Sequence, residues 1–175
     1  MLYVALLHSI ILPHGRLVMS DLRDLAESLG LKAPRTLAAT GNLVFDGERR
    51  AAPDLEADLE AAYQERFGRR VDIVVRDAAH WRRTVAANPF GDGPHVMVRI
   101  QRRPLAAVTF ERLEPYRPNE DEMRLVDGDL WVRFAGQPSQ SRLLSALTTQ
   151  RLGVGTSRIW NTVRRLGEMI TEVGI

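Results

Sequence analysis

The segment from Gly153 to Asn161 combines residue types that bind anions. Two glycines, two hydroxyl side chains and an arginine precede a predicted helix that begins near Arg158. The first backbone N–H groups of a helix have no partner within it, and the positive end of its dipole favours an anion. The sequence predicts a ligand site here, with Thr156, Ser157 and Arg158 at the anion and Trp160 and Asn161 against the rest of the ligand.

A second predicted helix start lies at Ser139-Gln140-Ser141-Arg142. If both starts open into one cleft, Ser141 and Arg142 join the first cluster around a phosphate group. The protein would then bind a phosphate-bearing small molecule or a nucleotide. The structural alternative is that the hydroxyl residues are ordinary helix caps and that Trp160 belongs to the core.

Alternation along two predicted strands gives a second hypothesis. If Val96, Val98 and Ile100 face the helices together with Leu130, Val132 and Phe134, the opposite face carries a mixture of basic and aromatic residues. These are His95, Met97, Arg99, Arg124, Trp131 and Arg133. Such a face is typical of proteins that bind single-stranded nucleic acid. The alternative is that it packs against the first half of the chain or against a second copy in a homodimer.

Signatures of known enzyme classes are missing from the sequence. The histidines are not spaced as metal ligands on one element, and there is no Walker loop and no Gly-x-Ser-x-Gly turn. His8-Ser9 would act as base and nucleophile only if the fold supplied an orienting acid and an oxyanion hole. We therefore expect a binding protein without metal or cofactor, although an active site assembled from distant loops stays open as an alternative.

The first half of the chain has the element order strand, helix, strand, strand, helix, strand. An apolar strand at 2–7 precedes a helix capped by Ser20 and ended by Gly30, and a tight hairpin around Gly41 follows. A second helix opens at Pro53 and stops at Gly68, before a β-rich run. This order is typical of a ferredoxin-like plait.

The second half repeats most of this order after a chain break at 88–94. A strand at 95–101, a helix at 104–113 and two strands around Asp127-Gly128 are followed by a helix from Ser139 and a final helix from Arg158. We predict an α+β fold of two tandem ferredoxin-like (α/β-plait) subdomains with mainly antiparallel sheets plus a C-terminal helix. The predicted subdomains are 1–90 and 95–175.

Composition is that of a globular protein of the cytoplasm. The 175 residues are 45% apolar and 26% charged, with no cysteine, which excludes disulfides and thiolate chemistry and fits a reducing compartment. The apolar start lacks the basic leader of a signal peptide and is too short to span a membrane. Lys32 is the only lysine, so arginine supplies nearly all the positive charge, and arginine suits phosphate and carboxylate recognition.

Several segments in this order resemble a bacterial family catalogued as domain of unknown function 1697. They are Tyr3-Val4-Ala5-Leu6-Leu7, the helix at 19–29, Thr40-Gly41-Asn42-Leu43-Val44-Phe45, Ala86-Ala87-Asn88-Pro89-Phe90, Ser141-Arg142-Leu143 and Trp160-Asn161-Thr162-Val163. The resemblance implies two α/β-plait-like subdomains and no established activity. Thr40-Gly41-Asn42 stands where the family has Ser-Gly-Asn, and Gly41 and Asn42 complete the predicted ligand-binding residues. The loop after the first strand departs from the family pattern.

Overall fold

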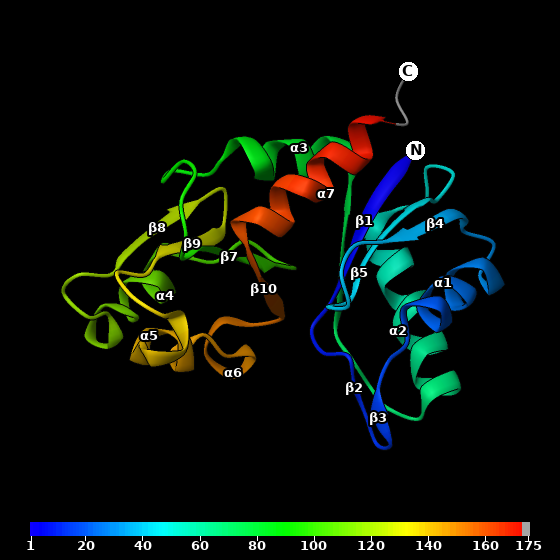
Figure 1. Ribbon diagram of the computed structural model, residues 1–175, viewed down its shortest axis with the longest axis horizontal. Coiled ribbons are helices and arrows are strands. Elements are labelled where there is room, and N and C mark those ends of the chain that lie inside the picture. The colour runs from blue at the N-terminus through cyan, green and yellow to red at the C-terminus, as the bar shows by residue number, and fades with distance from the viewer. Residues whose placement is uncertain (173–175) are drawn as a thin grey trace. The chain divides into compact units, whose positions relative to one another are not determined.

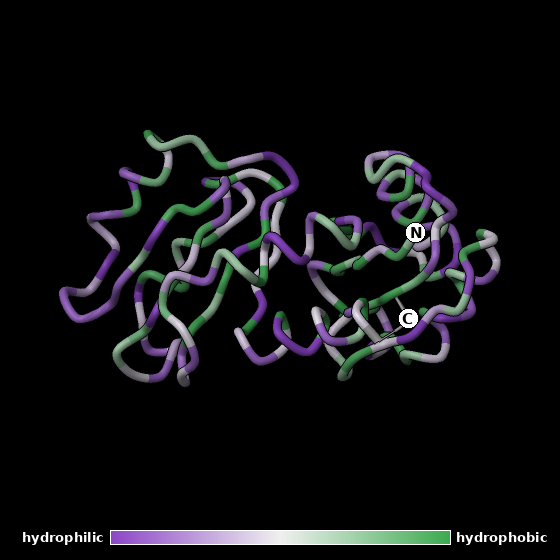
Figure 2. The backbone as a smooth tube through the Cα atoms, turned by 90° about the horizontal axis from the view of Figure 1, so that it is seen from above, coloured by the Kyte–Doolittle hydropathy of each residue, from purple (hydrophilic) through white to green (hydrophobic). Residues whose placement is uncertain are grey.

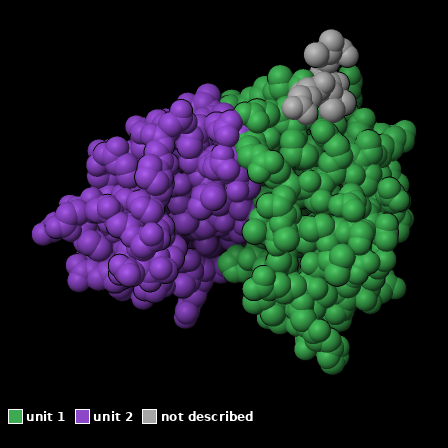
Figure 3. Space-filling view, in the orientation of Figure 1, with its two compact units in different colours: residues 1–83, 165–175 green, residues 84–164 purple. Residues whose placement is uncertain are grey.

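The computed structural model describes residues 1–172, which divide into two compact units (Figure 3). Unit 1 contains Met1–Arg83 and the C-terminal stretch that begins at Arg165, and unit 2 contains Thr84–Arg164. The divisions fall within helices α3 (Ala78–Ala86) and α7 (Trp160–Glu172), whereas the sequence predicted subdomains 1–90 and 95–175. Residues 173–175, the end of the predicted second subdomain, lie outside the described residues.

Unit 1 contains a four-stranded antiparallel sheet in the order β4-β5-β1-β6. Its main elements are β1 (Leu2–Leu7), α1 (Met19–Ser28), β4 (Lys32–Thr36), β5 (Asn42–Asp46), α2 (Ala52–Phe67) and β6 (Ile73–Asp77). A small hairpin, β2 (Ile11–Leu12) and β3 (Gly15–Arg16), lies between β1 and α1. Helix α1 begins at Met19 after Val18 rather than at a Ser20 cap, and a loop of residues 37–41 replaces the predicted tight hairpin.

The core of unit 1 lies between one sheet face and helices α1 and α2 (Figure 1). Alternate residues of β1, namely Tyr3, Ala5 and Leu7, point into this core. Figure 2 shows the hydrophobic character of these strands against more hydrophilic outer loops. Helix α2 ends as predicted at Gly68, whose left-handed φ of 70° suits a residue without a Cβ.

A carboxylate accepts a hydrogen bond from one backbone N–H at the outer edge of strand β6. Glu56 of α2 is 7% exposed, and its Oε2 accepts the backbone N–H of Val75 at 3.0 Å. Val75 stands opposite Ala5 of β1 in the sheet, but its N–H points away from that strand to the helix. A side chain thus satisfies a donor that the sheet leaves unpaired.

Unit 2 contains a second four-stranded antiparallel sheet, in the order β10-β7-β9-β8. Its elements are β7 (Val96–Gln101), α4 (Ala107–Glu111), the 3-10 helix η1 (Glu114–Tyr116), β8 (Glu122–Val126), β9 (Asp129–Arg133), the 3-10 helix η2 (Pro138–Gln140), α5 (Arg142–Ala146), α6 (Thr149–Leu152) and β10 (Gly155–Ile159). The chain is therefore α+β with two antiparallel sheets and a C-terminal helix, as predicted. Strand β10 was not predicted.

The pairing of β7 with β9 decides which residues share a face of the second sheet. Met97 stands opposite Val132, and Val98 stands opposite Trp131. Residues opposite each other lie on the same face, so the predicted grouping of Val98 with Val132 is wrong by one residue. Met97 and Val132 belong to the core under α5 and α6, whereas Val98 and Trp131 lie on the other face.

No helix within residues 1–172 is long and apolar enough to cross a membrane.

Candidate functional site

Thr156, Ser157 and Arg158 are not at a helix start. They lie in the extended strand β10, where Thr156 stands opposite Ile100 and Arg158 opposite Val98 of β7. The Arg158 side chain is 9% exposed and donates to Thr156 Oγ1 at 2.7 Å and to the Ser157 carbonyl at 2.9 Å. Burial lowers the pKa of this guanidinium to about 10. Helix α7 begins at Trp160, directly after this strand; the anion site predicted there stays a prediction, and the Arg158 side chain donates within its own strand.

Ser141 caps helix α5 instead of facing β10. Its hydroxyl accepts the N–H of Leu143 at 3.2 Å and donates to Asp121 Oδ2 at 2.7 Å. Asp121 immediately precedes β8, which lies at the opposite edge of the sheet from β10. Three strand spacings separate these edges, which is roughly 14 Å. The two predicted clusters do not converge, and the hypothesis of one cleft between them is wrong.

Trp160 and Asn161 have structural partners within unit 2. Trp160 Nε1 donates to Asp92 Oδ1 at 2.7 Å, and its ring packs at 6.0 Å from the ring of Trp131. Asn161 accepts from Arg164 at 2.9 Å. Trp131 is fully buried, so it cannot stack on a nucleic-acid base. The sheet face proposed to bind single-stranded nucleic acid therefore offers no exposed ring at Trp131 on which a base could stack.

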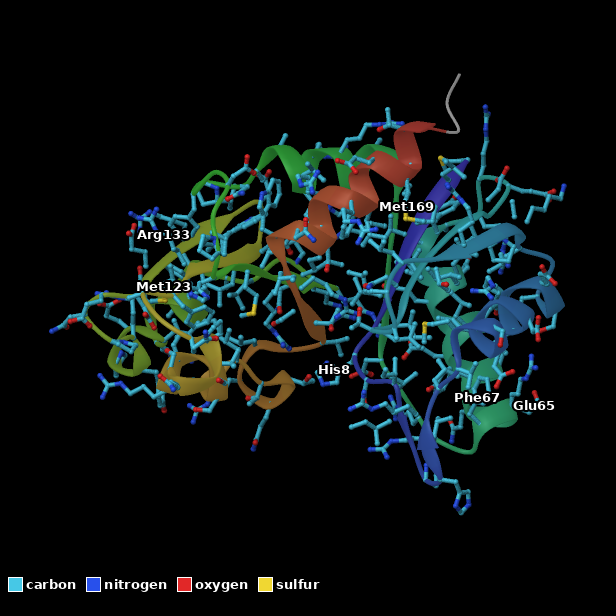
Figure 4. The ribbon with its side chains drawn as sticks, in the orientation of Figure 1. His8, Glu65, Phe67, Met123, Arg133 and Met169 are labelled. Carbon is cyan, nitrogen blue, oxygen red and sulfur yellow. The ribbon has the colours of Figure 1, made fainter. Side chains whose placement is uncertain are left out.

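The exposed part of that face is a small cluster around Phe90. The guanidinium groups of Arg124 and Arg133 lie 5.9 Å and 5.2 Å from the centre of its ring. Both also pair with the carboxylate of Glu122. Arg133, and Met123 of the neighbouring strand, are labelled in Figure 4. The two arginines share one carboxylate and one ring, so the cluster keeps one net positive charge while both guanidinium groups have partners in the protein.

Gly41 and Asn42 shape a turn in unit 1. The buried Asn42 amide donates to the Leu37 carbonyl at 2.9 Å and to Thr40 Oγ1 at 2.7 Å. Gly41 has a φ of 82°, and a Cβ there would meet Leu7 Cβ at 2.9 Å. Both residues hold the segment between β4 and β5, which accounts for them without a ligand.

Two pockets in unit 2 carry arginines that the sequence analysis did not select. The first, here the Arg112 pocket, has a volume of about 230 Å³ and is lined by Thr109, Arg112, Leu113, Arg151 and Leu152. Arg151 is held over the Tyr116 ring at 4.5 Å and donates to the Tyr116 hydroxyl at 2.7 Å. Its remaining donors stay available for a ligand.

Arg142, one of the predicted residues, lies beside this first pocket. Its Nε donates to the backbone carbonyl of Tyr116 at 3.2 Å, so Arg142 and Arg151 contact the same tyrosine. Arg142 is thus connected to the pocket through Tyr116 and does not line it.

The second pocket, here the Arg103 pocket, has a volume of about 340 Å³ and lies at the C-terminal end of α6. It is lined by Gln101, Arg102, Arg103, Leu152, Gly153 and Val154. Gln101 ends β7, Arg102 and Arg103 follow it, and residues 152–154 precede β10. The pairing of these two strands brings both segments together, since Gln101 stands opposite Gly155.

A buried arginine supports the wall of the Arg103 pocket. Arg99 is 2% exposed, and it donates to Gln101 Oε1 at 2.8 Å, to the Gly153 carbonyl at 3.0 Å and to the Leu147 carbonyl at 3.4 Å. Burial lowers its pKa from the ordinary value, but an arginine remains charged at neutral pH. Its partners are neutral oxygens, so a positive charge remains beneath this pocket.

No carboxylate lines either pocket. Within the described residues, Arg103, Arg112 and Arg151 form no ion pair with a carboxylate. The nearest buried acid with a defined role is Asp129, which accepts the backbone N–H of Gln101 at 2.9 Å. No group of three histidine or acidic side chains within residues 1–172 is arranged to hold a metal. The pockets are thus suited to bind anions.

The sequence contained a partial signal for these pockets. Arg102-Arg103 directly follows a fully buried strand, and a doublet at the end of such a strand is held in place by it. Arginine doublets also occur at 49–50, 69–70, 82–83 and 164–165, so nothing in the sequence distinguishes this one. Only the pairing of β7 with the unpredicted strand β10 brings the doublet next to Gly153.

Comparison with known proteins identifies a family and a fold. The profile of the family "Protein of unknown function (DUF1697)" matches residues 1–131, and no curated protein matches the chain. A solved structure described as conserved bacterial protein SP0830 from Streptococcus pneumoniae is similar to it. The TM-score is 0.76 at 17% sequence identity, covering 97% of this chain and 98% of the other. This likeness concerns the fold. The chain belongs to the DUF1697 family, as its sequence motifs indicated.

Proposed function

We propose that unit 2 binds a small molecule bearing a phosphate group, in the Arg112 and Arg103 pockets. The observation that carries the proposal is the composition of the two linings, which contain four arginines and no carboxylate. Guanidinium groups bind phosphate through paired, charge-assisted hydrogen bonds. The volumes are at and below the lower end of the range for small-molecule sites, which favours a compact ligand.

The backbone around Gly153 supports this proposal. Gly153 has a φ of 82°, and the space where a Cβ would stand is open. A ligand can therefore approach the main chain closely at this point of the Arg103 pocket. Thr109 in the other pocket adds a hydroxyl that can donate to a phosphate oxygen.

The proposal is tested by calorimetric titration of orthophosphate and adenosine monophosphate into the wild type and two double variants. The variants are R112A/R151A and R102A/R103A, and the control R69A/R70A removes the same charge from exposed residues of unit 1. Charged hydrogen bonds contribute about 1.5–3 kcal/mol each, so we expect roughly a tenfold or greater loss of affinity in a pocket variant. Pocket variants that bind as tightly as the control would refute the proposal.

The strand order supports a further structural proposal, that each unit is a ferredoxin-like plait. In both sheets the order along the sheet is the fourth, first, third and second main strand of the unit. A cytoplasmic location, proposed from the absence of cysteine, and self-association remain predictions that fractionation and light scattering can test.

A further inference from the structure

We infer that the ligand carries two anionic groups and that one molecule spans both pockets across Leu152. This inference rests on the proposed function and specifies the ligand class. The two pockets share one wall, because Leu152 lines both of them. Arg151 lines the Arg112 pocket and Gly153 lines the Arg103 pocket. The pockets are therefore adjacent on the surface, on either side of one buried residue.

The short main-chain segment between the two linings bounds the size of the ligand. Arg151 and Gly153 are two positions apart, so their Cα atoms are separated by at most roughly 7 Å. Two anionic groups joined by a short linker span such a distance. A linear oligophosphate or a small metabolite with a phosphate at each end has this chemistry, and a single orthophosphate does not.

The wall between the pockets is fixed by buried hydrogen bonds. Gln101 Nε2 donates to the Leu152 carbonyl at 2.6 Å, and Arg99 holds the carbonyls of Leu147 and Gly153. These bonds fasten the ends of α5 and α6 to strand β7, which continues directly into Arg102 and Arg103. The backbone of Arg151 and that of Arg102 and Arg103 therefore keep a constant separation before any ligand binds.

A fixed separation favours a ligand with two charges over two separate ions. Once the first anionic group is bound, the second is held near its own pocket at an effective concentration in the millimolar range. The gain over a single group is on the order of 10²–10⁴ in affinity when the linker matches the spacing. The expected ligand therefore binds once per chain, and both arginine pairs contribute to the same event.

The test is a titration series with orthophosphate, pyrophosphate and tripolyphosphate in magnesium-free buffer at low and moderate salt. We expect one tripolyphosphate per wild-type chain, bound about 100-fold or more tightly than orthophosphate. R112A/R151A and R102A/R103A should each reduce tripolyphosphate affinity to about the level of orthophosphate. The quadruple variant should bind neither, and R69A/R70A should retain the wild-type ratio. Circular dichroism checks that every variant is folded.

Other results would overturn the inference in distinguishable ways. If the advantage of tripolyphosphate persists in both pocket variants, or if two molecules bind per chain, the pockets act independently, and anion binding still stands. If R69A/R70A loses as much affinity as the pocket variants, binding follows overall charge and spanning is rejected. If the wild type binds none of the three anions, the proposed function itself fails.

Discussion

At the scale of single residues, a buried polar atom without a hydrogen-bond partner gives a direct test of what determines the stability of the fold. The Tyr63 hydroxyl is buried in the core of unit 1 without a hydrogen-bond partner. Tyr3 lies in the same core, but its hydroxyl donates to the Arg50 carbonyl. A buried hydroxyl without a partner destabilises the fold, whereas a bonded one contributes to stability. These two tyrosines therefore form a matched pair for mutation.

We expect Tyr63→Phe to raise the free energy of unfolding by about 1 kcal/mol, because it removes an unsatisfied donor. Tyr3→Phe, the control, should lower it by a similar amount. Urea denaturation at pH 7 measures both changes. A destabilised Tyr63→Phe protein would show that the hydroxyl has a partner in solution, such as a bound water.

The same residue predicts the response to alkaline pH. Burial raises the pKa of the Tyr63 phenol above its ordinary value of 10.0, so the unfolded chain loses this proton first. The contribution of this group is therefore complete below pH 10 and is lost as the pH rises through the higher folded-state pKa. Melting temperatures between pH 8 and 11 should fall less steeply in Tyr63→Phe than in the wild type. Equal slopes would contradict this.

Gly155 is required by close contact rather than by its backbone angles. A Cβ at this position would lie 2.4 Å from Gln101 Oε1 and 2.8 Å from the Ile100 carbonyl. Gly155→Ala should destabilise the protein by about 1–3 kcal/mol through overpacking, measured by thermal denaturation. Gly136→Ala is the control because its Cβ would meet no atom within 4 Å. Similar melting temperatures for the two variants would contradict the close contact.

At the scale of secondary-structure elements, the ends of two short helices depend on one buried side chain. Helices α5 and α6 end near Leu147 and Gly153, whose carbonyls both accept from Arg99. A cation near the C-terminal ends of helices offsets their dipoles. Neither helix has more than five residues, so neither would persist without such tertiary contacts.

Arg99→Met tests this dependence. It keeps most of the side-chain bulk but leaves three buried acceptors without a donor, and we expect a loss of about 3 kcal/mol in stability. Amide exchange should accelerate at Leu152 and Gly153, whose N–H groups close the last turn of α6. The exposed Arg112→Met is the control and should alter neither quantity. Unchanged exchange at α6 in Arg99→Met would show that other contacts hold the helix.

Elements set by local residues were predicted well, and those set by distant pairing were not. The hairpin between β8 and β9 follows from Asp127 and Gly128, which have φ values of 50° and 83° as a two-residue turn requires. Strand β10 was mistaken for a helix start, because Gly155 and the two hydroxyl residues after it resemble a capping segment. Its conformation is decided by pairing with β7, more than fifty residues away in the chain.

The candidate site was predicted less well than the fold for the same reason. Its residues come from separate stretches, 101–103, 109–113 and 151–154. No short motif joins these stretches, and only the register of the sheet brings two of them together. Arg158, which resembled an anion ligand in sequence, is buried in strand β10 opposite Val98.

At the scale of the whole molecule, ligand binding should depend on pH only through the ligand. The charged residues that line both pockets are arginines, which stay protonated throughout the ordinary pH range. A phosphate monoester gains its second charge near pH 6. We therefore expect its affinity to rise from pH 5 to 7.5 and then to stay level up to pH 9. Calorimetric titration across this range measures it, with sulfate as a ligand whose charge stays constant.

A fall in phosphate affinity between pH 7.5 and 9 would contradict an arginine-only site, because it would require a group that loses its positive charge there. A sulfate affinity that changes between pH 5 and 7.5 would point to a histidine near the ligand. His8, His14, His80 and His95 all lie outside the two pocket linings.

The Glu56 carboxylate at the edge of unit 1 has a consequence for aggregation. The strand that it covers has the run Ile73-Val74-Val75, a composition with high β propensity and no charge. A strand edge of this kind recruits strands from other molecules when local opening exposes it, and in the folded unit Ile73, Val74 and Val75 are buried. By occupying the Val75 N–H, Glu56 removes one of the donors that such intermolecular pairing needs. We therefore expect this one glutamate to disfavour strand addition at the edge of β6.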